Sequence, residues 1–185
     1  MLKPLLLIVV LVITGSNVSA QTIQTGFRFE PAFTLTNVNS ENEVNFSPYS
    51  LYASIKGNIS ERISLEVRPG YFMGEENYGG PELGGFFHYR VIDGWKILLG
   101  YNYHSNTWLG GSNNRGGYSK KINHTAVGLL YQKDSKLSFD ITYFIPHDRV
   151  FGYSNHIDSM GKSVLSEKKV NGIIKLGFSI MWDIY

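Results

Sequence analysis

Hydrophobic and polar side chains alternate along most of this chain, and the alternation predicts its secondary structure. Between Phe27 and Leu35, apolar residues occupy nearly every second position, with Arg28 and Glu30 among the residues between them. A period of two is that of a β-strand, whose successive side chains point to opposite faces. The pattern predicts eight strands, at residues 26–35, 50–59, 63–71, 83–91, 96–104, 123–132, 137–145 and 172–184. No helical period follows residue 20, so the predicted fold class is all-β.

The predicted connections alternate in length. Three are tight turns, at residues 58–63, 91–95 and 132–137, whereas the other four are longer and polar, the longest spanning residues 147–169. Short turns at one end and long loops at the other are typical of barrels in the bacterial outer membrane. We therefore predict an eight-stranded antiparallel up-and-down transmembrane β-barrel with both chain ends on the short-turn side.

The distribution of aromatic residues indicates that the apolar face is the outer one. Tyr and Trp residues of this face gather near the two predicted ends of the barrel: Tyr49, Tyr71, Tyr103 and Tyr143 at the long-loop end, and Tyr89, Trp95, Tyr131 and Trp182 at the other. Two aromatic girdles are expected of a barrel in lipid. The alternative is a soluble barrel, which alternates in the same way but turns its apolar side chains inward.

The polar face carries charges of both signs at mid-strand. We predict that these residues line the lumen and form an ion-pair network: Arg28, Glu30, Lys56, Glu66, Arg68, Arg90, Asp140 and Lys175. Mutual pairing suits a narrow barrel that is filled by its own side chains. A narrow channel or proton path that uses the same charges is the functional alternative.

The first 20 residues have the features of a secretory signal peptide. Lys3 precedes an apolar run from Leu5 to Ile13, and Val18-Ser19-Ala20 is a small-residue cleavage site. Residue 21 is Gln rather than the Cys of a lipoprotein. We predict that residues 1–20 are cleaved and that residues 21–185 form one barrel domain in a bacterial outer membrane.

Charge and composition narrow the choice of partners. The chain has 17 Lys and Arg against 15 Asp and Glu, and loss of Lys3 leaves the remainder nearly neutral, so no nucleic-acid partner is expected. There are no cysteines, so no disulfide contributes to stability. We expect no cofactor, and we expect a monomer in contact with outer-membrane lipid.

Signal peptide, strand number, loop alternation and aromatic C-terminal end together resemble the small bacterial outer-membrane barrels, of the OmpX, OmpA membrane-domain and lipid A deacylase types. The resemblance implies an eight-stranded barrel and, for the first two types, a structural or surface-interaction role. The chain departs from the pattern at its end, because Trp182 and Ile184 share the predicted lipid face whereas Tyr185 falls in the opposite register.

The resemblance to the deacylase directs attention to His104, Ser105 and Asn106. It implies a His and a Ser two residues apart on one strand, where His can accept the Ser proton. Here the two are adjacent, so a regular strand points them to opposite faces. We therefore predict no catalytic residue. The alternative of a lipid A or phospholipid acyl hydrolase that uses these residues stays open, since a β-bulge would change the geometry.

Two histidines fall on the predicted lumen face near one rim. His104 and His124 lie on neighbouring antiparallel strands, and we expect them to form a pair. Two imidazoles without a third strong ligand are a weak metal signal, so no metal is predicted. A plug of hydrogen-bonded side chains is the simpler interpretation.

The longest loops offer the main candidates for interaction. Residues 106–121 and 147–169 mix Tyr, Trp and Asn with Gly, Ser and basic residues, a composition that suits binding to an extracellular protein or glycan. Four lysines at the predicted ends of these loops could hold lipopolysaccharide phosphates: Lys120, Lys121, Lys168 and Lys169. We predict a structural or surface-interaction role that these loops carry.

Overall fold

The computed structural model describes residues 22–38, 40–74, 78–108, 118–134, 136–157 and 161–184. The predicted signal peptide, Tyr185 and most of the loop at residues 106–121 lie outside these ranges. The described residues contain no helix long and apolar enough to cross a membrane.

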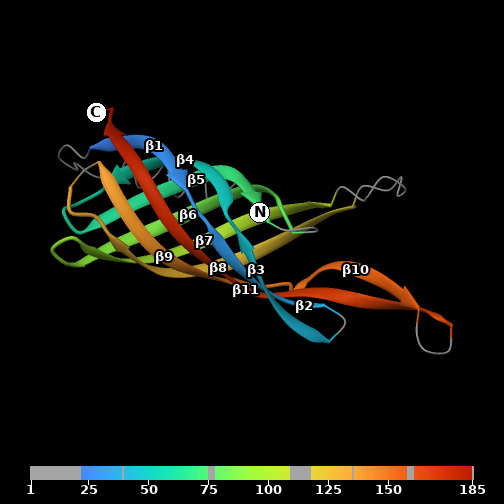
Figure 1. Ribbon diagram of the computed structural model, residues 1–185. Helices are drawn as coiled ribbons and strands as arrows, with labels where there is room; N and C mark the ends of the chain where they lie inside the picture. Colours follow the sequence, from blue (N-terminus) through green and yellow to red (C-terminus); the bar gives the residue numbers. More distant parts are fainter. Residues whose placement is uncertain are drawn as a thin grey trace.

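Eleven strands make one antiparallel sheet (Figure 1). They are β1 (Ile23–Phe29), β2 (Ala32–Val38), β3 (Glu41–Ser47), β4 (Tyr49–Asn58), β5 (Ile63–Met73), β6 (Gly80–Ile92), β7 (Trp95–Trp108), β8 (Tyr118–Tyr131), β9 (Leu137–Pro146), β10 (Val150–Ile157) and β11 (Ser163–Asp183).

Eight of these strands form a closed ring. Its order is β1-β4-β5-β6-β7-β8-β9-β11, and the pairing of β1 with β11, which sets Phe27 opposite Ile180, closes it. Closure gives every ring strand a hydrogen-bonded neighbour on both sides and removes the sheet edges from the ring. The prediction of an eight-stranded antiparallel barrel is confirmed.

The remaining strands extend the barrel at its long-loop end. β1 and β2 keep one register along β11 across Glu30 and Pro31, where the missing N–H of proline interrupts the ladder. The register on the other side of β1 and β2 changes at Pro48, since Phe29 pairs with Leu51 of β4 whereas Ala32 pairs with Ser47 of β3. The β2–β3 and β10–β11 hairpins project beyond the barrel (Figure 1).

These hairpins correct the prediction of long loops at two places. Residues 41–47 and 150–157 are strands, and β11 begins at Ser163 rather than near residue 172. The sequence there is polar, but backbone hydrogen bonds do not depend on side-chain polarity, and both segments pair along nearly their whole length. The three predicted tight turns are present as connections between β4 and β5, β6 and β7, and β8 and β9.

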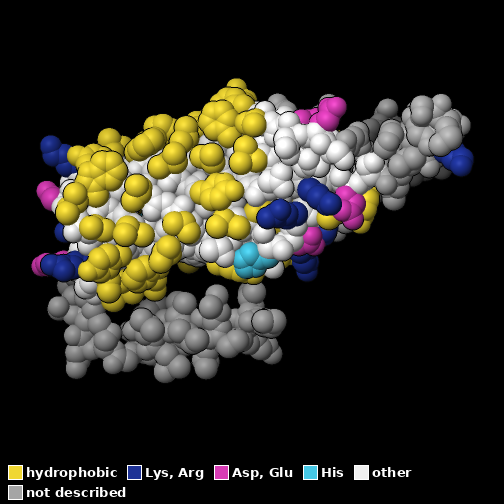
Figure 2. Space-filling view, turned by 90° about the horizontal axis from the view of Figure 1, so that it is seen from below, with side chains coloured by type: hydrophobic (Ala, Val, Ile, Leu, Met, Phe, Trp, Pro, Cys, Tyr) yellow, Lys and Arg dark blue, Asp and Glu magenta, His cyan; other side chains and the backbone are white. Residues whose placement is uncertain are grey.

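The barrel is apolar outside and polar inside. Phe27 is 71% exposed on the outer face, whereas Arg28, the next residue, is 2% exposed inside. Figure 2 shows apolar side chains gathered over the barrel, with charged side chains beyond them towards both ends. The predicted girdle residues Tyr49, Tyr71 and Trp95 are all exposed. A soluble barrel would place these residues in its interior, so the observed faces favour the transmembrane alternative.

We predict that an arginine at the middle of this belt destabilises the protein strongly. Leu99 is 47% exposed and lies midway between Trp95 and Tyr103 on β7. In phospholipid vesicles, L99R should lower the free energy of unfolding in urea by about 2–4 kcal/mol, because lipid solvates the charge poorly.

Val44 provides the matched control, since it is 65% exposed on β3, beyond the ring. V44R should change the unfolding free energy by no more than about 0.5 kcal/mol. Equal, small effects of L99R and V44R would mean that the exposed belt does not face lipid.

Candidate functional site

The lumen holds an unusual number of charges. Among the described residues, these Lys, Arg, Asp and Glu side chains are buried: Arg28, Glu30, Lys56, Glu66, Arg68, Glu82, Lys96, Asp140 and Lys175. All but Glu30, which lies between β1 and β2, sit at inward positions of their strands, and strand alternation repeats such positions every two residues. Burying a charge is costly unless it is paired and hydrogen-bonded, so the partners of each group decide what the lumen can do.

One cluster centres on Arg28 and Arg68. The Arg28 guanidinium bonds to the carboxylates of Glu30 and Asp140. Arg68 lies with Nη2 2.8 Å from Glu66 Oε2 and Nη1 3.4 Å from Glu30 Oε1. Glu30 therefore bridges the two arginines across the lumen.

This cluster depends on a close approach of β11. A Cβ atom added at Gly177 would come 1.8 Å from Arg28 Nη2 and 2.6 Å from Asp140 Oδ2. Only glycine leaves room at this position for the Arg28–Asp140 pair. Thr142 Oγ1 donates a hydrogen bond of 2.8 Å to the other carboxylate oxygen of Asp140.

A second cluster centres on Glu82. Its Oε2 atom accepts hydrogen bonds from Lys175 Nζ at 2.6 Å and from the Tyr52 hydroxyl at 2.6 Å. Its Oε1 atom lies 3.0 Å from His104 Nδ1. Lys175 Nζ is also 3.7 Å from Glu30 Oε2, so the two clusters form one continuous network.

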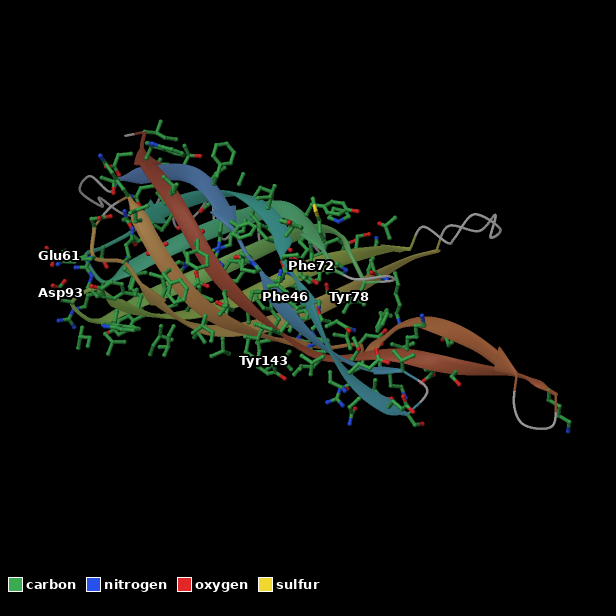
Figure 3. All side chains as sticks on the ribbon, in the orientation of Figure 1. Phe46, Glu61, Phe72, Tyr78, Asp93 and Tyr143 are labelled. Atoms are coloured by element: carbon green, nitrogen blue, oxygen red, sulfur yellow. The ribbon has the colours of Figure 1, made fainter. Side chains whose placement is uncertain are left out.

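Aromatic rings cover the network on the long-loop side. Tyr78 stacks on His104 with ring centroids 4.6 Å apart, and Phe72 and Phe151 meet Tyr78 edge-on at 5.8 and 5.3 Å. Figure 3 places Phe72 and Tyr78 far from Glu61 and Asp93, which mark the turns of the other end. We call Phe72, Tyr78 and Phe151 the aromatic cap.

Of the three consecutive residues His104, Ser105 and Asn106, the first and the last meet in the lumen, where His104 Nε2 lies 3.4 Å from Asn106 Oδ1. His104 and Asn106 are fully buried on the lumen side, whereas Ser105 is half-buried in the opposite register. Asn106 Oδ1 accepts a hydrogen bond from the Gly79 backbone N–H at 2.9 Å, and its Nδ2 donates to the Phe151 carbonyl at 3.4 Å. Asn106 thus links the two segments that contain Tyr78 and Phe151 of the aromatic cap to β7. Because side chains alternate along a strand, Ser105 points away from the His104 imidazole.

The predicted histidine pair is close but differently bonded. The rings of His104 and His124 are 6.2 Å apart between centroids. His104 contacts Glu82, whereas His124 Nε2 lies 2.9 Å from the Tyr78 hydroxyl. No group of three or more His, Cys, Asp or Glu in the described part of the chain is placed to hold a metal ion.

Six of the eight predicted residues form the ion-pair network, and Lys56 and Arg90 do not. Lys56 is buried, but its ammonium group bonds to Gln132 and has no acidic side chain at ion-pair distance among the described residues. Arg90 is not buried. β6 continues to Ile92, and its last four residues, from Tyr89 onward, are all exposed at the short-turn end. The prediction that Arg90 belongs to the buried network is therefore wrong.

Glu82 is the member of the network that the sequence reasoning missed. The predicted strand began at residue 83, whereas β6 begins at Gly80. The sequence pattern could have identified Glu82, which lies in the same alternating register as Phe86 and His88. Extending the predicted strand by one residue would have included it.

No protein-family model and no curated protein sequence matches this chain. Among solved structures, the N-terminal β-barrel domain of Pseudomonas aeruginosa OprF matches with a TM-score of 0.51 at 10% identity, over 88% of this chain and 100% of that domain. Neisserial surface protein A gives a TM-score of 0.45 at 12% identity, over 86% of this chain and 96% of that one.

At this level of identity the similarity concerns the fold alone. It agrees with the predicted resemblance to small eight-stranded barrels and, together with the apolar belt, with the predicted bacterial outer-membrane location. The chain has the fold of the small outer-membrane β-barrel proteins.

Proposed function

We propose that this outer-membrane barrel has a structural lumen and acts through its outer surface, by contacts of its extended strands with lipopolysaccharide and with an extracellular protein or glycan. The continuous ion-pair network under an aromatic cap carries the proposal. A lumen filled in this way gives partners at the cell surface no path through the barrel, so we place their binding on its outside.

The bonding of the network supports a structural role. The carboxylates of Glu30, Glu66, Glu82 and Asp140 each have at least two charged or hydrogen-bonding partners. Moving or hydrating one charge would break contacts of several others. A conducting path needs polar groups that exchange partners with passing ions or water, whereas these groups hold one another.

The hairpins offer surface outside the apolar belt. Val44 and Phe46 on β3 and Tyr153 on β10 are 65%, 47% and 52% exposed. Exposed aromatic side chains among polar ones are characteristic of protein and carbohydrate contacts. β3 and β10 are also edge strands, since β3 pairs with β2 alone and β10 with β11 alone among the described strands.

Among Lys120, Lys121 and Lys169, the strongest candidate for a lipopolysaccharide phosphate is Lys121. It is exposed on the outer face of β8, with Nζ 6.0 Å from the centre of the Tyr103 ring, at the outer edge of the belt. Lys120 instead bonds to the Val150 carbonyl and lies 2.8 Å from Asp148 Oδ2, a contact that holds the pKa of this carboxyl below its usual range. Lys169 is paired with Glu167 at 2.8 Å.

We predict that E82Q lowers the free energy of unfolding by about 3 kcal/mol, because it leaves the Lys175 ammonium buried without its nearest carboxylate. Urea unfolding in phospholipid vesicles measures the change. The double variant E82Q/K175M should recover at least half of the loss, since it removes both charges. Wild-type stability in E82Q would contradict a structural role for the network.

We also predict that K121Q weakens stabilisation by lipopolysaccharide. The wild-type protein should melt at a higher temperature in lipopolysaccharide-containing vesicles than in a phosphate-free detergent. K121Q should reduce this difference by about 2–4 °C, since one interfacial cation contributes about 1 kcal/mol.

The control for K121Q is K136Q, an exposed lysine in the turn before β9, at the opposite end of the barrel. K136Q should leave the lipopolysaccharide-dependent difference unchanged. An equal change in both variants, or none in K121Q, would show that Lys121 does not bind the phosphate.

A further inference from the structure

The short-turn mouth of the barrel contains an open cavity of about 720 Å³. The two turns that follow β4 and β8 form part of its wall, together with residues of β1, β6, β7 and β11. Glu61, labelled in Figure 3, lies on this wall and marks the end of the molecule at which the cavity opens. The ion-pair network and the aromatic cap described above lie deeper in the lumen.

Two buried lysines meet in this cavity without a carboxylate. Lys56 and Lys96 are 3% and 8% exposed. Their Nζ atoms lie 2.9 and 2.8 Å from the same atom, Gln132 Oε1. Within the described ranges neither ammonium group has an acidic side chain at ion-pair distance. Glu66 is the cross-strand partner of Lys56, but its carboxylate bonds to Arg68 and His88 instead.

One neutral oxygen therefore stands between two positive charges. An amide oxygen accepts both hydrogen bonds but carries no net charge, so it does not neutralise the lysines. An anionic oxygen would accept the same two hydrogen bonds and would add the Coulomb attraction of its charge to both ammonium groups. The position of Gln132 Oε1 is thus one where an anionic oxygen would bind two ammonium groups at once.

The whole mouth has an excess of positive charge. Its lining contains five cationic residues, Lys56, Arg62, Arg90, Lys96 and Lys133, against three acidic ones, Glu61, Asp134 and Asp183, a difference of two.

Two of the three acidic residues already accept hydrogen bonds from other groups. Asp183 accepts a hydrogen bond of 2.8 Å from Gln24. Asp134 accepts bonds from the backbone N–H groups of Leu137 and Lys136 at 2.8 and 2.9 Å, and these bonds hold the pKa of Asp134 below its usual range. Among the described residues, neither Asp134 nor Asp183 forms an ion pair with Lys56 or Lys96.

We propose that this mouth is an anion-binding vestibule, in which Lys56 and Lys96 together bind one phosphate or carboxylate group of a small solute, with Gln132 moving aside and Arg90 adding charge at the rim. The ion-pair network above the two lysines blocks further passage, so the anion binds and leaves by the same opening. This proposal does not depend on the role of the outer surface.

Isothermal titration of the purified protein with inorganic phosphate and, separately, with succinate tests the vestibule. A maltoside detergent is needed, because phosphocholine head groups would compete for the site. We expect wild-type protein to bind at least one of the two anions, and the comparison shows whether the site prefers a phosphate or a carboxylate. K56Q and K96Q should bind the preferred anion about tenfold more weakly.

K136Q is the control for a general loss of charge, since Lys136 lies at the same end of the barrel but outside the cavity lining. It should bind as the wild type does. Heat-modifiable gel mobility shows whether each variant is folded. Absence of binding to both anions by the wild type, or equal binding by all variants, would overturn the proposal.

A third variant tests the site without removing a lysine. Q132E places a carboxylate at the position proposed for the anion, between the two ammonium groups. It should raise the melting temperature and abolish binding of the free anion. A Q132E protein that binds the anion as the wild type does, or that is less stable, would contradict the proposed geometry.

Discussion

Closure of the sheet by the pairing of β1 with β11 is the constraint on which the rest of this structure depends. Once the ring is closed, hydrogen bonds between neighbours satisfy the backbone of its strands, and lipid can contact the outer face without meeting unpaired polar groups. The strand period of two then assigns every second side chain to lipid and the others to the lumen. Phe27 and Arg28, adjacent in sequence and opposite in exposure, show the result.

A ring of eight strands leaves an interior that side chains must fill. This chain fills the middle with Arg28, Arg68, Lys175 and their carboxylates, and covers them with the aromatic cap on the long-loop side. Each of these three cations contacts at least one of the carboxylates. Among the described residues, two buried lysines near the short-turn mouth have no carboxylate at ion-pair distance, and there the lumen opens into a cavity. Structural and binding regions of the interior are thereby separated along the barrel.

The alternation of apolar and polar residues was enough to predict the eight strands of the ring, their two faces and most of the network, because the side chains of each strand alternate between the two faces. It placed seven of the eight predicted residues inside, six of them in the ion-pair network and Lys56 outside it. It failed at Arg90 because strand register does not indicate where the lumen ends. The contact of His104 with Glu82 and that of Phe151 with Tyr78 join segments that are distant in sequence. A local pattern of apolar and polar residues does not predict such contacts. The β2–β3 and β10–β11 hairpins were missed because their polar residues resemble those of loops.

We propose that the charged lumen acts as a plug, and single-channel recording of the purified protein in planar lipid bilayers tests this proposal. We expect no stable conductance steps for the wild type, because the ion-pair network and the aromatic cap block the path. Stable steps in the wild type that change in size when Arg28 or Glu82 is substituted would show that the lumen is not a plug, since ions would then pass through the network itself.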